Sequence, residues 1–445
     1  MRYLAHRRLR LILSKRNGTQ SDFDISLNLN VRGAPLSATL KINEISNQLK
    51  QSGKKIYKLG LGQSPFPVPR AVVEELRTNA HQKDYLDVVG LYELRKAVAD
   101  YHSRRNSIQR NAEDVLIGPG SKELMFLLQF TYYGDLLIPT PSWVSYAPQA
   151  FFIGRQIQWI PTSEKNKWRI LPDDLERFCK NDPNRPRILI LNYPSNPTGV
   201  TYSESELKDL AIVARKYHLI LLSDEIYGEL NFEGKHISIS KYYPEGTIIS
   251  SGLSKWCGAG GWRLGTFTFP QSLSWLLKSM ASVASETFTS TSAPIQYAAV
   301  RAFNGGVDIE RYLWNARKIL KSLGLKMYKE LSGCGVTVPK PEGGFYMFLN
   351  FRKHTARLKR KNIETSEELA NRLLQDVGVA VLPGSVFGRP QEELTVRVAY
   401  VDFDGPKALA AAETLPPHKT LDSDFLNSYC SNMLEASEIM CKWLK

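Results

Sequence analysis

Short, continuously apolar segments recur along the middle of the chain, and each is followed by a polar or glycine-rich cluster. We predict these segments as strands at residues 115–117, 135–138, 187–191, 219–223 and 247–250, with helices between most of them. Strands that are apolar on both faces indicate a largely parallel sheet covered by helices on both sides. The sequence therefore predicts an α/β fold, and its 445 residues are enough for two domains.

The polar clusters share one position, directly after a predicted strand. They lie at residues 118–122, 141–143, 192–199 and 224–227. The carboxyl ends of parallel strands meet at one edge of a sheet, and ligands of such folds bind there. We therefore expect the clusters to converge on a single crevice.

The remaining segments predict further helices and a second, smaller layer. Apolar residues recur at helical spacing over 36–49, 70–80, 92–101 and much of 266–334, whereas prolines and glycines keep 58–69 extended. Residues 343–349 and 394–400 are predicted as strands of the second layer. Residues 404–423, rich in Ala, Pro and Thr, are predicted as a surface excursion before a closing helix at 424–444.

Lys255 stands where the strand over 247–250 gives way to a loop. Trp256 and Trp262 can shelter it, and a sheltered lysine amine is a nucleophile toward carbonyl carbon. Arg263 follows eight residues later among glycines, where its fork can bind a phosphate. The alternative is a surface lysine followed by a glycine-rich turn.

Other residues at the strand ends suit a phosphate-bearing aromatic cofactor. The turn at 118–122 opens a helix whose free N–H groups suit an anion, and Ser254 can complete the cradle. Trp143 can stack on a ring, and Asp224, after an apolar strand, needs a cationic partner such as a protonated pyridine nitrogen. Tyr227 and Asn196 can hydrogen-bond a ring oxygen. Each alone has an ordinary explanation, such as a helix cap or a core tryptophan, so their joint order carries the prediction.

The net charge of +14 is unevenly distributed, because residues 1–16 hold six basic residues and no acid. This resembles a mitochondrial presequence, and a basic tail on a cytosolic protein is the alternative, so we expect the mitochondrial matrix or the cytoplasm. No basic patch with interleaved aromatics is visible, so we expect neither a nucleic-acid nor a membrane partner. The five scattered cysteines predict a reducing compartment, no disulfide framework and no structural zinc.

Taken together, these motifs resemble those of fold-type I pyridoxal-phosphate enzymes, in particular the bacterial-type (class I gamma) aspartate aminotransferases, over about residues 36–402. The resemblance implies a large domain at 67–334, with a mostly parallel seven-stranded sheet between helices. It also implies a smaller α+β domain from 31–66 and 335–445, after a basic extension at 1–30. A homodimer with shared active sites is implied as well.

The resemblance assigns roles around the cofactor, pyridoxal 5′-phosphate. Lys255 would form a Schiff base with it and carry the proton that leaves the substrate α-carbon. Asp224 would keep the pyridine nitrogen protonated, Tyr227 and Asn196 would bind the phenolic oxygen, and Trp143 would stack on the ring. The phosphate would be held by Ser254, Arg263, the amides of Ser121 and Lys122, and Tyr85 of the partner subunit.

The resemblance also assigns the substrate contacts. Arg397, with Gly62 and Asn196, would bind the α-carboxylate, and Lys122, Ser37 and Thr39 would contact a distal carboxylate. The implied reaction is a ping-pong transamination between aspartate, or another dicarboxylic amino acid, and a 2-oxo acid. The alternatives are an aromatic or neutral amino donor, a pyridoxal-phosphate lyase or oxidase on the same fold, and a non-enzymatic binding or regulatory module.

Three short stretches depart from the family pattern. Gly252 stands where many members have a serine that contacts the phosphate, so that hydrogen bond is expected to be missing or moved to Ser251. Residues 63–65 read Gln-Ser-Pro in place of the commoner Glu-Pro-Asp. Gly258 and Gly260 predict a looser loop after Lys255.

Overall fold

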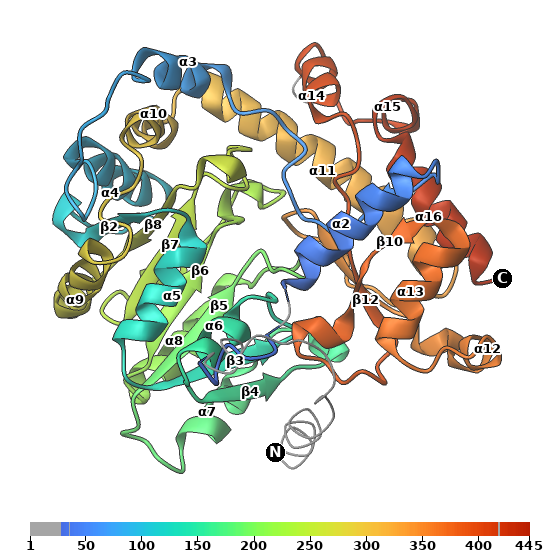
Figure 1. Cartoon of the computed structure of the whole chain (residues 1–445), viewed down its shortest axis with the longest axis horizontal. Coiled ribbons are helices and arrows are strands. Elements are labelled where there is room, and N and C mark those ends of the chain that lie inside the picture. Colours follow the sequence, from blue (N-terminus) through green and yellow to red (C-terminus); the bar gives the residue numbers. More distant parts are fainter. Residues whose placement is uncertain (1–27, 35, 417–418) are drawn as a thin grey trace, which may run out of the picture. The chain divides into compact units, whose positions relative to one another are not determined.

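The computed structural model describes residues 28–34, 36–416 and 419–445 (Figure 1). Residues 28–34 belong to a separate N-terminal unit and form a turn, whereas residues 36–445 form one compact unit. The predicted presequence lies outside the described residues, as does the basic extension at 1–30 apart from its last three residues. Among the described residues, no helix combines the length and the apolar character needed to cross a bilayer.

A seven-stranded sheet forms the centre of residues 36–445, as predicted (Figure 1). Its order is β2 (Val115–Gly118), β8 (Gly265–Thr268), β7 (Thr247–Gly252), β6 (Ile220–Asp224), β5 (Arg187–Asn192), β3 (Asp135–Thr140) and β4 (Ile157–Pro161). β8 runs antiparallel to both of its neighbours, and the other paired strands are parallel. The mostly parallel α/β architecture is therefore confirmed.

The sequence missed two strands of this sheet. β4 is an edge strand in which Ile160 alone is buried, so it lacks the continuous apolar run of an inner strand. β8 reads Gly-Thr-Phe-Thr and is buried throughout, and its two threonines conceal it from a search for apolar runs. Both strands gain their place from pairing with neighbours rather than from their own composition.

Alternating side chains of the inner strands point into separate cores on the two faces of the sheet. Leu136, Ile190 and Leu222 pack against α5 (Ser121–Thr131), α6 (Tyr146–Phe152) and α9 (Ser274–Ser285). Leu137, Leu189 and Leu221 pack against α7 (Pro172–Cys179) and α8 (Glu204–Lys216). This two-residue alternation explains why the strands read as continuously apolar.

Further helices complete this part of the molecule and join it to a second sheet (Figure 1). These are α2 (Ala38–Gln51), α3 (Arg70–Thr78), α4 (Tyr92–Asn106), α10 (Ala293–Asn304) and α11 (Val307–Gly333). The second sheet is antiparallel in the order β11 (Leu382–Pro383), β12 (Thr395–Ala399) and β9 (Tyr346–Asn350). α12 (Thr355–Arg360) and α13 (Ser366–Val377) accompany it, and β1 (Tyr57–Lys58) pairs with β10 (Val379–Ala380).

The predicted surface excursion at 404–423 is wrong in its first half. α14 (Gly405–Glu413) occupies it, and its buried residues Ala408 and Ala412 belong to the same core as α11. Asp404 caps this helix by accepting a hydrogen bond from the Lys407 N–H. The predicted closing helix is two helices, α15 (Ser423–Tyr429) and α16 (Ser431–Trp443), which are separated at Cys430.

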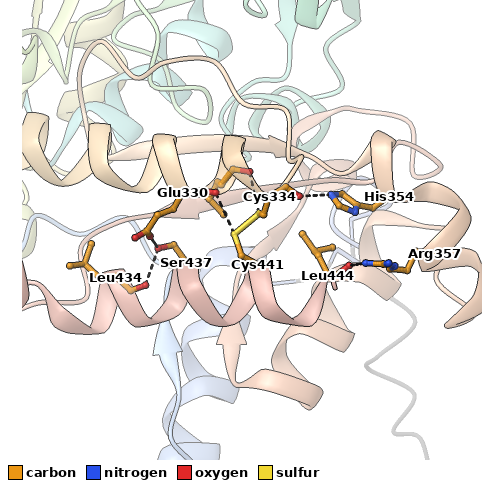
Figure 2. The surroundings of a disulfide bond; sticks show 9 residues. Glu330, Cys334, His354, Arg357, Leu434, Ser437, Cys441 and Leu444 are labelled. Atoms are coloured by element: carbon orange, nitrogen blue, oxygen red, sulfur yellow. Dashed lines mark hydrogen bonds between the residues drawn. A yellow bond between two sulfur atoms is a disulfide. The ribbon is translucent and has the colours of Figure 1, made fainter.

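A disulfide joins Cys334, at the end of α11, to Cys441 on α16 (Figure 2). The two Cα atoms lie 5.6 Å apart although 107 residues separate the cysteines in the chain. The sequence predicted no disulfide framework, and this pair departs from that expectation. The sequence could not reveal it, because the pairing depends on how two helices pack. Cys179, Cys257 and Cys430 are free and buried.

Candidate active site

Lys255 lies in the loop after β7, half-buried against aromatic side chains. Its Nζ donates a hydrogen bond to the Gly62 carbonyl oxygen at 2.7 Å. The same atom lies 5.6 Å from the centre of the Tyr227 ring and 5.8 Å from that of Phe345. The amine is thus held by a neutral oxygen between two rings, a setting in which it can attack a carbonyl carbon.

Asp224 ends β6 as a buried carboxylate without a cationic hydrogen-bond partner among the described residues. The Tyr146 hydroxyl donates to its Oδ2 at 2.5 Å, and the Ile226 N–H points at Oδ1 from 3.4 Å. Burial raises the pKa of Asp224 to about 6, although the hydrogen bond from Tyr146 opposes this shift. Such a group is satisfied best by a positively charged ligand atom.

Arg397 is a buried cation whose hydrogen bonds within the described part of the chain go to neutral oxygens. Its Nη1 donates to Asn196 Oδ1 at 3.1 Å and its Nη2 donates to the Gly60 carbonyl. The guanidinium lies 4.7 Å from the Tyr346 ring centre and 5.0 Å from that of Phe387. Burial lowers the pKa of Arg397. An incoming carboxylate would supply the missing negative charge through two parallel hydrogen bonds.

Tyr227 is linked to the same region through Tyr346. Their hydroxyl oxygens lie 3.0 Å apart, and the Tyr346 hydroxyl also donates to the Gly62 carbonyl at 3.4 Å. A Cβ at Gly62 would stand 1.8 Å from the Tyr346 hydroxyl oxygen, so only glycine fits there. Gly62, Tyr227, Lys255 and Arg397 therefore lie around one space, as the sequence predicts.

A second group of residues forms a cradle for an anion at the start of α5. A Cβ at Gly120 would lie 2.1 Å from Arg263 Nη2, and a Cβ at Gly265 would lie 2.1 Å from the Ser121 nitrogen. These glycines let the guanidinium and the first N–H groups of the helix approach each other. No side chain caps this helix. Arg263 donates hydrogen bonds to the neutral Gly260 and Pro119 carbonyls, at 2.8 and 3.3 Å. A phosphate would compete with these carbonyls for the guanidinium and would bind the first N–H groups of the helix.

Lys122 adds another positive charge beside this cradle. Its Nζ lies 5.1 Å from the centre of the Trp143 ring. Burial lowers the pKa of Lys122, and the nearby charges of Arg263 and Lys255 lower it further. Three cations that repel one another in this way create a site for an anion.

Trp143 and Asp224 are joined through one side chain that the sequence did not single out. The ring of Tyr146 meets the Trp143 ring edge-on at 5.2 Å, and its hydroxyl is the one that binds Asp224. Asn192 was also missed: its Nδ2 donates to the Asp224 carbonyl at 2.9 Å, and its Oδ1 accepts from the Asn196 N–H at 2.7 Å. Asn192 follows the predicted strand directly, which was the available signal.

The carboxylate next to Asp224 has the opposite environment. Glu225 is buried, accepts hydrogen bonds from Ser223 Oγ at 2.8 Å and Ser238 Oγ at 2.5 Å, and lies 2.8 Å from His236 Nε2. Burial opposes ionisation here, but His236 and the serines hold the pKa of Glu225 below its usual value. The two adjacent carboxylates thus differ: Glu225 is paired with His236 and two serines, whereas Asp224 accepts hydrogen bonds from neutral groups.

The remaining predicted residues lie less centrally. Ser254 is half-buried beside Lys255. Ser37 Oγ and Thr39 Oγ1 lie 2.8 Å apart at the start of α2, and Ala38 between them packs against the cluster that contains Phe387. Tyr85 is 89% exposed, so within one subunit its ring is uncovered.

Two of the glycines that depart from the family pattern, Gly252 and Gly258, serve close packing. Gly252 has a φ of +155°, and a Cβ there would lie 2.6 Å from the Leu264 carbonyl oxygen. A serine would therefore push β7 away from β8. Gly258 has a φ of +69°, and its Cβ would lie 2.5 Å from the Phe66 carbonyl oxygen. The loop after Lys255 therefore lies close to the backbone at Phe66, and the looser loop stays a prediction.

These groups fit pyridoxal phosphate, the cofactor that the resemblance implies. The cradle at Gly120 and Gly265 suits its phosphate, the unpaired Asp224 carboxylate suits its ring nitrogen, and the Lys255 amine suits its aldehyde. The residues present thus fit the phosphate, the ring nitrogen and the aldehyde of the cofactor.

Comparison with known proteins gives a consistent result. The family described as aminotransferase class I and II matches residues 54–410. The aspartate aminotransferase of Geobacillus stearothermophilus is 32% identical, over 82% of this chain and 91% of its own. The aromatic-amino-acid aminotransferase 2 of Thermococcus litoralis is 31% identical, over 79% and 89%. The structure of Thermus thermophilus aspartate aminotransferase with maleate superposes with a TM-score of 0.79 at 26% identity, over 94% of this chain and 99% of that one.

Proposed function

The chain belongs to the class I and II aminotransferases, and we propose that it transfers the amino group of a dicarboxylic L-amino acid, with aspartate first, to a 2-oxo acid. Its cofactor is pyridoxal phosphate. The observation that carries the substrate proposal is the pair of cations Arg397 and Lys122. Arg397 is hydrogen-bonded to neutral oxygens, and the charges acting on Lys122 are positive. A substrate with two carboxylates would satisfy both.

The protein's residues divide the work of the reaction. Bound pyridoxal phosphate supplies an electron-accepting ring that stabilises negative charge on the substrate α-carbon. Asp224 would hold the ring nitrogen in its protonated form, because a buried carboxylate favours a cationic neighbour. Arg263 and the first N–H groups of α5 would hold the phosphate. The Lys255 Nζ would take the proton that leaves the substrate α-carbon and hold it as an ammonium group.

Arg397 would orient the substrate through its α-carboxylate, the group that every amino donor shares. The fork that now contacts Asn196 and the Gly60 carbonyl would turn to that carboxylate. Lys122 would contact the distal carboxylate from its place above Trp143. The relatives named aspartate aminotransferase, and the Thermus protein solved with maleate, a dicarboxylate, support this choice.

An aromatic amino donor is the second candidate, because the Thermococcus relative is an aromatic-amino-acid aminotransferase. Lys122 Nζ lies over the Trp143 ring. An aromatic substrate side chain beside Lys122 would make a cation–π contact with the same amine.

We also propose that the enzyme is a homodimer with shared sites. Tyr85 exposes 89% of its surface in a single chain, so its ring is free to contact a second subunit. Its contribution to the phosphate site of the partner subunit would cover it. A monomer in solution by light scattering, with full activity, would contradict this.

The test is an amino-donor panel with 2-oxoglutarate and oxaloacetate as acceptors. We expect aspartate or glutamate to be the best donor, with stoichiometric formation of the 2-oxo acid. Lys122→Ala should raise KM for that donor about tenfold and leave KM for phenylalanine nearly unchanged. Lys255→Ala should abolish transfer and is the control for background. A panel in which phenylalanine exceeds both acidic donors would favour the second candidate.

A further inference from the structure

The segment after the short helix η9 (Gly384–Phe387) docks on the end of β3 in the central sheet. The Ser142 N–H donates to the Phe387 carbonyl at 2.9 Å. Gly388 has a φ of +83°, and a Cβ there would lie 2.9 Å from the Trp159 ring and 3.1 Å from Thr140. The backbone at Gly388 therefore lies directly against the side chains of Thr140 at the end of β3 and Trp159 of β4.

Arg389 lies at this contact and binds both sides of it. Its Nε and Nη2 form a fork on Glu393 at 2.9 and 2.7 Å. Its Nη1 donates to Thr140 Oγ1 at 3.0 Å, to the Thr162 carbonyl at 3.2 Å and to the Thr140 carbonyl at 3.4 Å. The guanidinium lies 4.8 Å from the Trp168 ring centre, and the side chain is only 9% exposed. Glu393 belongs to the segment before β12, whereas Thr140 ends β3.

A chain of ring contacts runs from Arg389 to the substrate arginine. Trp168 meets Phe348 edge-on at 5.6 Å, and Phe348 meets Phe387 edge-on at 6.0 Å. The Phe387 ring in turn lies 5.0 Å from the guanidinium of Arg397. These three aromatic residues form one buried cluster with Leu382.

The same contact reaches the other wall of the site. Ser142 and Val144 flank Trp143 in the chain. Ser142 is bound by the Phe387 carbonyl, and Val144 packs against the aromatic cluster. Trp143 is thus fixed on both sides by contacts with the segment that Arg389 holds.

We propose that Arg389 is a positioning residue that sets the spacing between Arg397 and Trp143 by holding the η9 segment on the end of β3. It touches neither substrate nor cofactor and acts through Phe387. The proposal rests on the proposed function, because it concerns a substrate held between the two sheets. When the hold is loosened, a smaller fraction of the enzyme has both walls in place, and the apparent affinity for substrate falls in proportion.

The alternative is that Arg389 contributes only to stability, as many arginine–glutamate pairs do. Arg372 offers a matched control, because it forms a similar fork on Asp376 four residues later, at 3.2–3.3 Å. That pair lies on α13, and the Arg372 side chain is 41% exposed. Methionine at either position removes the fork and keeps much of the side-chain volume.

The experiment compares Arg389→Met and Arg372→Met in the holoenzyme. KM and kcat for aspartate, the dissociation constant of maleate by calorimetry, bound cofactor and Tm are measured for each. We expect Arg389→Met to raise KM and the maleate dissociation constant about tenfold with cofactor retained, and Arg372→Met to leave both within about twofold. Arg389→Lys, which can still reach the threonine carbonyls, should recover part of the loss and covers poor folding of the methionine variant.

The positioning role would be overturned if Arg389→Met and Arg372→Met had equal KM values and equal maleate dissociation constants, and Arg389→Met differed only in Tm. That result would leave the proposed function intact. A wild type that transfers no amino group from any donor and binds no maleate would overturn both. Phe387→Leu tests the route. If Arg389 acts through Phe387, the double variant raises KM by less than the product of the single effects, and a full product would refute that route.

Discussion

Asp224→Asn should make the cofactor-free protein more stable than wild type at neutral pH. The direction of the Asp224 pKa shift determines whether this stability difference rises or falls with pH. Burial raises the pKa of Asp224 from 3.8 to about 6. The folded protein therefore keeps this proton at a pH where the unfolded chain releases it. The stability that results is fully present below pH 3.8 and is lost as the pH rises through about 6. Asparagine has no such proton to lose.

The magnitude follows from the displacement of the pKa. A shift of about two units corresponds to about 3 kcal/mol, of which about 2 kcal/mol falls between pH 4.5 and 8. The unfolding free energy of Asp224→Asn, minus that of wild type, should therefore rise by about 2 kcal/mol over this range. Urea unfolding of the cofactor-free proteins at several pH values measures it.

Two variants sharpen the test. Glu225→Gln is the control with the opposite slope, because the folded pKa of Glu225 is lowered and its stabilising effect is present at high pH and lost as pH falls. Tyr146→Phe removes the hydrogen-bond donor that favours the charged form of Asp224. The pKa of Asp224 in the folded protein should therefore rise further, and the pH range over which stability is lost should extend to higher pH. With pyridoxal phosphate bound, wild type should be more stable than Asp224→Asn at neutral pH, because asparagine cannot form an ion pair with a protonated ring nitrogen. A difference between Asp224→Asn and wild type that stays flat from pH 4.5 to 8 would refute the reasoning.

Three further predictions follow from single contacts. Gly252→Ala should lower the unfolding free energy by about 1–3 kcal/mol, because its Cβ would lie 2.6 Å from the carbonyl oxygen of Leu264, the residue before β8. Gly261→Ala is the control and should be nearly neutral, because a Cβ there would meet no atom within 4 Å. Replacing Cys334 and Cys441 by serine should lower that free energy by about 2–4 kcal/mol under oxidising conditions. A dithiol reductant should erase the difference, and an equal loss in reductant would speak against the disulfide. Arg397→Lys should raise KM for every amino donor about a hundredfold, because lysine cannot fork onto the α-carboxylate; a loss limited to acidic donors would contradict this.

The sequence alone was sufficient for the sheet and for the order of the functional clusters. Five of the seven strands of the central sheet (β2, β3, β5, β6 and β7) could be predicted, because their residues face cores on both sides of the sheet and are apolar in succession. Lys255, Asp224 and Asn196 could be predicted as a set because the carboxyl ends of parallel strands share one edge of the sheet. The strands β4 and β8 escaped detection, since pairing rather than composition defines them.

Only the tertiary structure decided how each functional group is partnered. Tyr146 reaches Asp224 across 78 residues, Arg397 reaches Asn196 across 201, and Cys334 meets Cys441 across 107. Glu225 and Asp224 are neighbours in the chain, yet one carboxylate is fully paired and the other is left for a ligand. Local sequence determines which residues stand at the ends of strands. The free energy of a buried charge depends on the atoms around it, and those come from distant parts of the chain.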